Sequence, residues 1–224
     1  PMLYIGEHLG TMIDKSNAVK ADIAVDPLEC TKNCAFDLPN AITVLAIAPR
    51  NTLLNAPDTY MNKVVGGKDL VGYISLNNSI EDNIKICSKV LEKKTSDIVV
   101  IVLDRPRNQY IMDAVTSIGA KYELISDGDI MGSLRVICGE ADMLMGIGSA
   151  PEGVITATAV KGMRGVFEGQ LKPHNNSTLE RTKKMLGENY DKIWTSDELC
   201  TSDDSVFVAT GVCDGWLKGV EKSD

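Results

Sequence analysis

The chain has 224 residues, of which 44% are hydrophobic and 24% are charged, and this length suffices for one large globular domain or two small ones. The formal net charge of −8 and the pI near 4.9 argue against a nucleic-acid partner, because proteins that bind the phosphate backbone present a surface rich in Lys and Arg. No run of 18 apolar residues predicts a transmembrane helix, and we expect no membrane partner.

Apolar, β-branched runs predict strands, and most of these runs end in Asp or Gly. In chain order they cover Asp22–Asp26, Ile42–Ala48, Leu70–Leu76, Asp97–Leu103, Tyr122–Ser126, Met143–Ile147 and Val206–Thr210. Helical patterns are predicted over Ser79–Lys93, Gln109–Ile118, Val154–Met163 and Ser177–Gly187.

The order of these patterns predicts an α/β protein built in two segments. Residues 1–76 are rich in strand, and we expect them to form part of an N-terminal subdomain with a mixed sheet. Residues 77–224 form a C-terminal αβ subdomain. Between Asp97 and Met163 strands and helices alternate, which predicts a parallel βαβ unit whose ligand loops lie at the carboxyl ends of its strands.

The cysteine and histidine content limits the kinds of metal site and catalytic mechanism that the chain can have. The chain has six Cys and no CxxC pair, a pattern typical of reduced thiols in a cytoplasmic protein. With two His in the chain, a His-rich metal site is excluded, and a Ser-His-Asp or Cys-His mechanism is disfavoured.

The first chemical motif follows the predicted strand Asp22–Asp26 and contains Asp26, Glu29 and Thr31. Mg²⁺ prefers oxygen ligands and keeps some of its water, so two carboxylates beside a hydroxyl suit a cation site with an oriented water. Pro27 ends the strand sharply and can turn both acids toward one point. An ordinary acidic turn is the alternative interpretation.

The second motif is the loop Gly146–Gly153, which also follows an apolar strand. Its small residues allow close approach of a ligand to the backbone, and Pro151 suits the first turn of the helix that follows. N–H groups at a helix start attract phosphate, and Glu152 at this position is a further candidate metal ligand. A plain strand-to-helix turn is the alternative.

Two further motifs end strands of the αβ region. Arg105 and Arg107 carry guanidinium groups that can hold phosphate, and Asp127 and Asp129 flank a glycine that can present both acids to sugar hydroxyls or a metal. Solvated arginines and a plain turn are the alternatives. The shared position of these residues with Glu152, at the carboxyl ends of strands, favours one common ligand site.

Several stretches resemble the class II fructose-1,6-bisphosphatases, including the bifunctional fructose-1,6-/sedoheptulose-1,7-bisphosphatases. They lie in the order of that family and span nearly the whole chain. The matching stretches are Pro1–Glu7, Asp22–Thr31, Asn40–Ala46, Asn55–Lys63, Asp104–Arg107, Ser126–Ile130, Gly146–Val154 and Val206–Val220.

The resemblance implies a layered α-β-α-β-α sandwich of the lithium-sensitive sugar-phosphatase type, incomplete at both ends. It implies hydrolysis of the 1-phosphate of a ketose bisphosphate with Mg²⁺ or Mn²⁺, in gluconeogenesis or the Calvin cycle. It also implies a homodimer or homotetramer in the cytoplasm, or in a plastid if the source is a photosynthetic eukaryote.

Residue roles carried over by position fall into three groups. The metal ligands would be Asp26, Glu29 and Glu152, and Thr31 would help to activate the attacking water alongside Asp26 and Glu29. The residues lining the substrate site would be Glu29, Cys30, Thr31, Tyr60, Arg105, Pro106, Arg107, Asp127, Gly128, Asp129 and Ser149.

This chain departs from the family pattern at Cys30 and Ser149, where the family usually has Gly. The resemblance also places further metal-binding acids ahead of Pro1, so we expect the chain to correspond to the middle of the enzyme. These departures keep open a non-catalytic relative that binds sugar phosphates. An enzyme of the inositol-monophosphatase type is a third interpretation, allowed by the motif from Asp26 to Thr31.

Overall fold

The computed structural model describes residues 6–12 and 15–221. Its strands are β1 (Ala21–Glu29), β2 (Ile42–Pro49), β3 (Tyr60–Gly66), β4 (Val99–Leu103), β5 (Lys121–Ile125), β6 (Met143–Ser149), β7 (Val166–Lys172), β8 (Ile193–Thr195) and β9 (Val206–Gly211). Its α-helices are α1 (Thr31–Ala35), α2 (Ile80–Val90), α3 (Gln109–Ser117), α4 (Asp129–Ile137), α5 (Ala150–Gly162), α6 (Asn176–Leu186) and α7 (Ser196–Leu199). Short 3-10 helices cover Lys68–Leu70 (η1), Thr95–Asp97 (η2), Pro106–Asn108 (η3) and Gly187–Asp191 (η4).

Within this described part of the chain the strands form two sheets. The larger sheet has the order β5-β4-β6-β3-β7-β8, and the smaller sheet has the order β1-β2-β9. Strand β4 runs parallel to β5 and β6, which confirms the predicted parallel βαβ unit. The pairs β3–β6, β3–β7 and β1–β2 are antiparallel.

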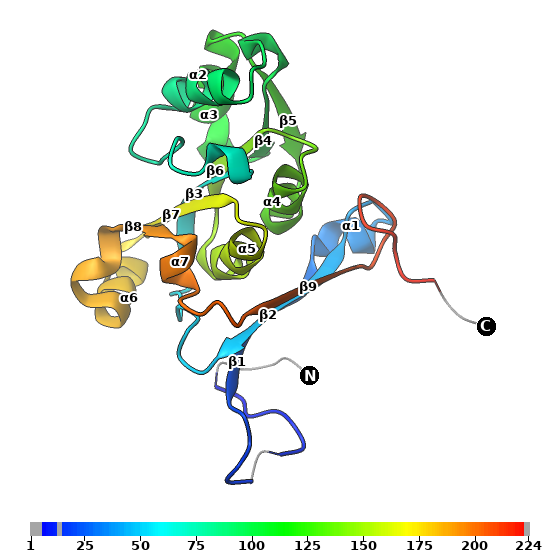
Figure 1. The fold of residues 1–224 in the computed structure, drawn as a ribbon, viewed down its shortest axis with the longest axis vertical. Helices are drawn as coiled ribbons and strands as arrows, with labels where there is room; N and C mark the ends of the chain where they lie inside the picture. The colour runs from blue at the N-terminus through cyan, green and yellow to red at the C-terminus, as the bar shows by residue number, and fades with distance from the viewer. Residues whose placement is uncertain (1–5, 13–14, 222–224) are drawn as a thin grey trace.

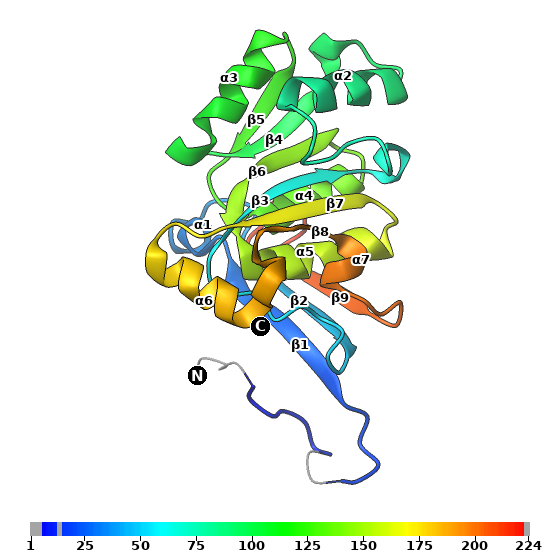
Figure 2. The same cartoon turned by 90° about the vertical axis from the view of Figure 1, so that its left-hand side faces the viewer.

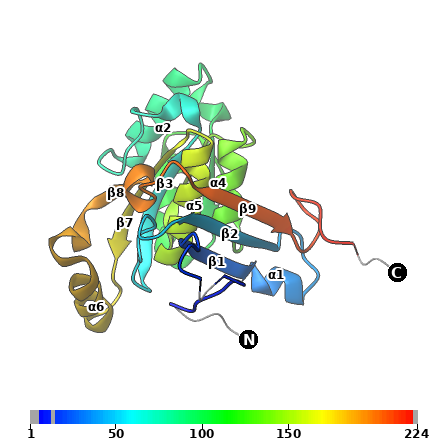
Figure 3. The ribbon, with the colours of Figure 1, turned by 60° about the horizontal axis from the view of Figure 1, so that its bottom comes forward.

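The elements stack in layers, which Figure 2 shows from top to bottom. Helices α2 and α3 cover one face of the larger sheet, and α4 and α5 lie between the two sheets (Figure 1). Figure 3 shows the smaller sheet in front of α4 and α5. The layered α/β fold is thus confirmed. Of the α-β-α-β-α order, residues 6–12 and 15–221 form four layers, because no helix among them covers the outer face of the smaller sheet.

Helix α5 explains why the middle layer is the most apolar part of the molecule. One side of α5 packs Val154, Ala157 and Val160 against the larger sheet, and the other side packs Ile155 and Ala159 against the smaller one. A helix between two sheets has no solvent face, so its sequence is apolar all round. This burial fixes the first turn of α5, where Glu152 lies, relative to both sheets.

One predicted strand is wrong. Residues 70–76 form the end of η1 and a turn, in which Gly72 has a φ of +79°. Leu70 and Ile74 are buried, so the apolar run reflects packing against α2 rather than pairing in a sheet. The prediction missed three strands, β3, β7 and β8, of which β3 pairs with both β6 and β7 at the centre of the larger sheet.

Each sheet contains strands from both sides of the predicted boundary between residues 76 and 77. Strand β3 precedes that boundary but belongs to the larger sheet, and β9 follows it but pairs with β2 in the smaller sheet. The division into segments 1–76 and 77–224 therefore stays a prediction.

Two expectations concern the chain ends and membranes. Residues 1–5 of the first family-like stretch, Pro1–Glu7, lie outside the described residues. Among the residues that are described, no helix has the length and apolar character needed to cross a membrane.

The packing predicts a contrast between two phenylalanines. Phe167 is 1% exposed and lies in the core beneath α5, whereas Phe36 is 73% exposed. We expect Phe167→Ala to lower the free energy of unfolding by about 3–5 kcal/mol, through lost burial and a residual cavity. The matched surface change Phe36→Ala should stay within about 0.5 kcal/mol. Urea unfolding followed by circular dichroism measures both, and equal effects would contradict the assigned core.

Candidate active site

Three carboxylates from separate parts of the chain meet at one point. Glu29 ends β1, Asp129 opens α4, and Glu152 lies in the first turn of α5. One carboxylate oxygen from each lies within 4.8 Å of those of the other two, a spacing that allows them to share a metal ion. We call Glu29, Asp129 and Glu152 the acid cluster.

The local structure of β1 brings Glu29 to this point. Asp26 pairs with Val44 but Glu29 pairs with Ile42, so β1 carries one extra residue in a bulge that contains Pro27. Glu29 is 3% exposed, and its two oxygens accept hydrogen bonds from the N–H groups of Ile130 at 2.8 Å and Met131 at 3.2 Å. These donors belong to the first turn of α4, which favours negative charge.

Asp129 is held by a lysine that the sequence analysis did not single out. Lys63 of β3 is 1% exposed and donates to Asp129 Oδ2 at 2.6 Å. The other oxygen, Asp129 Oδ1, is buried without a donor among the described residues. A side chain at Gly148 would put its Cβ 1.8 Å from Asp129 Oδ2, so this ion pair requires glycine there.

The cluster carries more negative charge than Lys63 balances. Burial, followed by the charge of Asp129, raises the pKa of Glu29 well above its ordinary value. The same two causes raise the pKa of Glu152 to about 7, although Lys63 opposes the shift. Either a proton on Glu152, which hydrogen-bonds to Asp129, or a cation satisfies the unpartnered oxygen. The carboxylate donors and this orphaned oxygen fit a hard divalent cation.

Asp26 lies beside the acid cluster rather than within it. Its Oδ1 accepts a hydrogen bond from the Leu28 N–H at 3.1 Å, and its charge contributes to the raised pKa of Glu152. Burial chiefly raises the pKa of Asp26 itself. Of the predicted ligands, Glu29 and Glu152 come together, and their third close partner is Asp129, which we had expected to bind sugar.

Cys30 and Gly128 pack against each other next to the acid cluster. Cys30 is buried and has a φ of +64°, which ends β1 before Thr31 starts α1. A Cβ at Gly128, whose φ is +85°, would lie 2.4 Å from Cys30 Sγ. Gly128 is therefore needed both for its backbone conformation and for the room that the thiol takes.

The two predicted arginines differ in what they contact. Arg105 donates to the carbonyl oxygens of Asp104 and Ser126 and to Asp127 Oδ1, so its guanidinium braces the loop before α4. Arg107 donates through Nε to the Ile147 carbonyl at 2.9 Å. Its two terminal amino groups have no hydrogen-bond partner among the described residues, which leaves them available to an anion.

The remaining predicted residues lie around these groups. Thr31 is exposed at the start of α1, and Pro106 opens η3 ahead of Arg107. Tyr60 begins β3 and pairs with Ser149, the N-cap residue of α5. The Arg107 guanidinium lies 4.4 Å from the centre of the Tyr60 ring.

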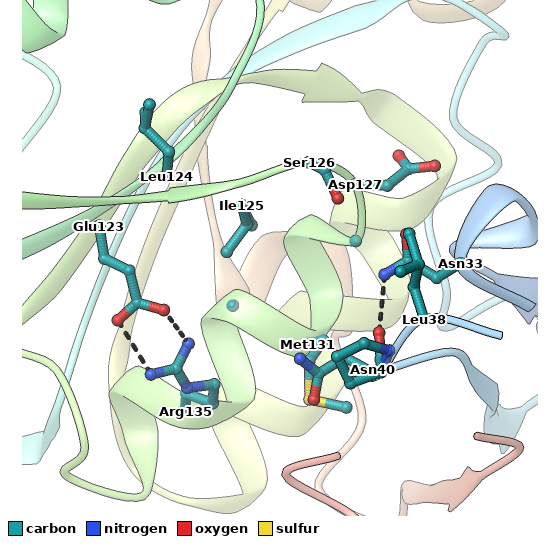
Figure 4. A pocket seen from close by; sticks show the side chains of 13 residues that line it. Asn33, Leu38, Asn40, Glu123, Leu124, Ile125, Ser126, Asp127, Met131 and Arg135 are labelled. Atoms are coloured by element: carbon teal, nitrogen blue, oxygen red, sulfur yellow. Dashed lines mark hydrogen bonds and ion pairs between the residues drawn. The ribbon is translucent and has the colours of Figure 1, made fainter. Parts of the chain in front are cut away.

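A cavity of about 220 Å³ opens next to this region, between β5, α4 and the loop after α1 (Figure 4). Ser126 and Asp127 lie at its rim, and Asn33 and Asn40 line another side. Arg135, which also lines it, makes two hydrogen bonds to Glu123. None of the three clustered acids lines this cavity, so it is distinct from the acid cluster.

Lys63 is the functional residue that sequence reasoning missed. A usable signal was present, because side chains alternate between the faces of a strand and Lys63 follows the buried Met61 by two residues. Without β3 in the predicted set of strands, no face could be assigned to it.

Comparison with known proteins agrees with this geometry. A family model described as bacterial fructose-1,6-bisphosphatase, glpX-encoded, matches residues 1–224. The chain is 38% identical to the class 2 fructose-1,6-bisphosphatase of Haemophilus influenzae, over 99% of this chain and 70% of that protein. It is 36% identical to the D-fructose 1,6-bisphosphatase class 2/sedoheptulose 1,7-bisphosphatase of Synechococcus elongatus, over 97% and 69%. The corresponding Thermosynechococcus vestitus protein is 37% identical over 98% and 70%. The chain therefore belongs to the family of glpX-encoded bacterial fructose-1,6-bisphosphatases.

Proposed function

We propose that this protein hydrolyses the 1-phosphate of fructose 1,6-bisphosphate, and of sedoheptulose 1,7-bisphosphate, with Mg²⁺ or Mn²⁺. The relatives named for these activities support the substrate class. The observation that carries the proposal is the acid cluster, in which three oxygen ligands meet beside one buried lysine. A location in the cytoplasm and assembly into a homodimer or homotetramer stay predictions from the family.

Glu29, Asp129 and Glu152 would hold the cation, with Asp26 next to them. A divalent cation at such a site neutralises charge on the phosphoryl oxygens and lowers the pKa of water. The protein prepares this site in advance, because the Lys63 ammonium fixes Asp129 and the N–H groups of α4 fix Glu29. Ligands that do not reorganise during the reaction stabilise developing charge most effectively.

Other side chains would bind and orient the substrate. The Thr31 hydroxyl, exposed one residue after Cys30, would form a hydrogen bond with the attacking water and so orient it. The free amino groups of Arg107 would bind phosphate oxygens, and Tyr60 would support them. Roles for Cys30, Arg105, Pro106, Asp127, Gly128 and Ser149 in lining the sugar site stay proposals.

The choice of substrate tests the proposed reaction class. We expect the 224-residue protein with Mg²⁺ to release phosphate faster from fructose 1,6-bisphosphate or sedoheptulose 1,7-bisphosphate than from inositol 1-phosphate. The physical reason is that Arg107 offers a cationic contact that a second phosphate can use and a monophosphate cannot. Phosphate release in a colorimetric assay measures all three rates. A preference for inositol 1-phosphate, or tight bisphosphate binding without release, would contradict the proposal.

Glu152 gives the sharpest variant for the reaction itself. Glu152→Gln keeps the size of the side chain but removes one anionic oxygen ligand, and we expect at least an approximately 10²-fold loss of kcat. The circular dichroism spectrum and the unfolding midpoint should show an intact fold. Glu188→Gln, at an exposed acid in η4, is the matched control and should leave turnover unchanged. An unaltered kcat in Glu152→Gln would remove Glu152 from the proposed machinery.

The pKa shift of Glu152 predicts how stability depends on pH without metal. Its folded-state pKa of about 7 is raised above the ordinary 4.5, so the folded state holds a proton that the unfolded state has lost. Stability from this group is present below pH 4.5 and is lost as pH rises through 7, by roughly 1–3 kcal/mol. In EDTA we expect the melting temperature to fall between pH 5 and pH 8.

Mg²⁺ should reverse this loss, because it binds the deprotonated carboxylates. We expect a larger rise in melting temperature on adding Mg²⁺ at pH 8 than at pH 6, measured by differential scanning calorimetry. The Glu152→Gln variant removes one titrating group and should make the pH dependence in EDTA shallower, although Glu29, whose pKa is also raised, still titrates. A protein whose melting temperature rises from pH 5 to pH 8 in EDTA, or is insensitive to Mg²⁺, would contradict this account.

A further inference from the structure

A second aromatic ring lies against the Tyr60 ring that Arg107 contacts. The imidazole of His174 packs on the Tyr60 ring with their centres 5.2 Å apart and their planes tilted by 50°. The Arg107 guanidinium lies 4.4 Å from the centre of the same Tyr60 ring. Tyr60 thus contacts both an imidazole and a cation, and each contact restrains the ring.

The backbone on both sides of His174 fixes where it lies. Pro173 precedes it directly after β7, and its ring locks φ. Asn175 follows it as the N-cap of α6, where Asn175 Oδ1 accepts from the Thr178 N–H at 2.8 Å and Thr178 Oγ1 accepts from the Asn175 N–H at 3.2 Å. This capping box anchors the turn that presents the imidazole.

Tyr60 is anchored as firmly. It pairs with Ser149 of β6 on one side and with Lys172 of β7 on the other, two residues before His174. Within the described part of the chain, the Arg107 side chain makes one hydrogen bond, from Nε to the Ile147 carbonyl oxygen. The orientation of its two terminal amino groups therefore depends on the Tyr60 ring beneath it.

Strand geometry separates this group from the acid cluster. Tyr60 and Lys63 lie three residues apart in β3, which is about 10 Å, and side chains three apart point to opposite faces of the sheet. Lys63 holds Asp129 of the acid cluster. The Tyr60 ring is therefore directed to the face of β3 opposite to the one that carries Lys63.

We propose that His174 is a positioning residue, which holds the Tyr60 ring so that Arg107 presents its free amino groups to a phosphate of the substrate. This inference rests on the proposed function, which supplies a substrate with two phosphates. His174 acts through the ring contact with Tyr60, and its nitrogens do not touch the substrate.

Three variants of His174 separate this role from others. His174→Ala removes the ring, and we expect KM for fructose 1,6-bisphosphate to rise about 2- to 10-fold with kcat unchanged, as for a contact made equally in the ground and transition states. His174→Phe keeps a ring and should restore the wild-type KM. His174→Gln keeps polarity without a ring and should resemble His174→Ala. Lys183→Ala, which removes a similar cation–ring contact with Tyr190, is the control and should leave KM unchanged.

Two results would overturn the inference. A wild-type KM in His174→Ala would show that Tyr60 and Arg107 need no third partner. Rescue by Gln but not by Phe would show that the imidazole nitrogens bind the phosphate directly.

A crystal structure of His174→Ala gives a readout that does not depend on hydrolysis. We expect the Arg107 guanidinium to leave its place over the Tyr60 ring in His174→Ala and to keep it in His174→Phe. An unmoved Arg107 in His174→Ala contradicts the inference even if the wild-type protein hydrolyses no bisphosphate, whereas a moved Arg107 supports it whether or not the proposed function holds.

Discussion

The buried ion pair between Lys63 and Asp129 is the constraint on which the rest of the site depends. Removing an ammonium and a carboxylate from water costs several kcal/mol each, and their mutual attraction offsets this only in a close pair with good geometry. Here two more carboxylates, those of Glu29 and Glu152, lie close enough to Asp129 for the three acids to share a metal ion. Buried negative charge of this size is stable only with bound protons or a cation, so the site suits a divalent cation.

The surrounding fold supplies what this charge needs. The bulge in β1 and the left-handed Cys30 turn Glu29 onto the N–H groups of α4, and the apolar all-round packing of α5 fixes Glu152 between two sheets. A side chain at Gly148 would clash with Asp129, and a side chain at Gly128 would clash with Cys30. The site thus combines residues from three layers of the molecule: the smaller sheet, the helices between the sheets and the larger sheet. The residues that fix the fold here are also the ones that would bind the cation.

Sequence reasoning reached the parts of this arrangement that local patterns encode. The apolar runs before Asp26, Arg105 and Glu152 predicted strands β1, β4 and β6. For β4 and β6 the reason is burial on both faces, which leaves a continuous apolar signature. The family resemblance then assigned roles that spacing alone left open. Neither the patterns nor the resemblance revealed the role of Lys63, because a lysine is expected at the surface until β3 is placed between β6 and β7. They also did not reveal that Asp129 lies beside Glu29, because this contact depends on how α4 packs against β1. The run at Leu70–Leu76 misled for a different reason. Leu70 and Ile74 are buried although they flank a turn, so an apolar run here does not mark a strand.

The central claim is that Glu29, Asp129 and Glu152 bind one divalent cation together. The most direct measurement is a crystal structure of the protein soaked in Mn²⁺, with anomalous scattering used to locate the ion. The account predicts an anomalous peak between these three carboxylates, in contact with Asp129 Oδ1. A peak held by other residues, or a Lys63–Asp129 pair that leaves Asp129 Oδ1 without a ligand in saturating Mn²⁺, would contradict it.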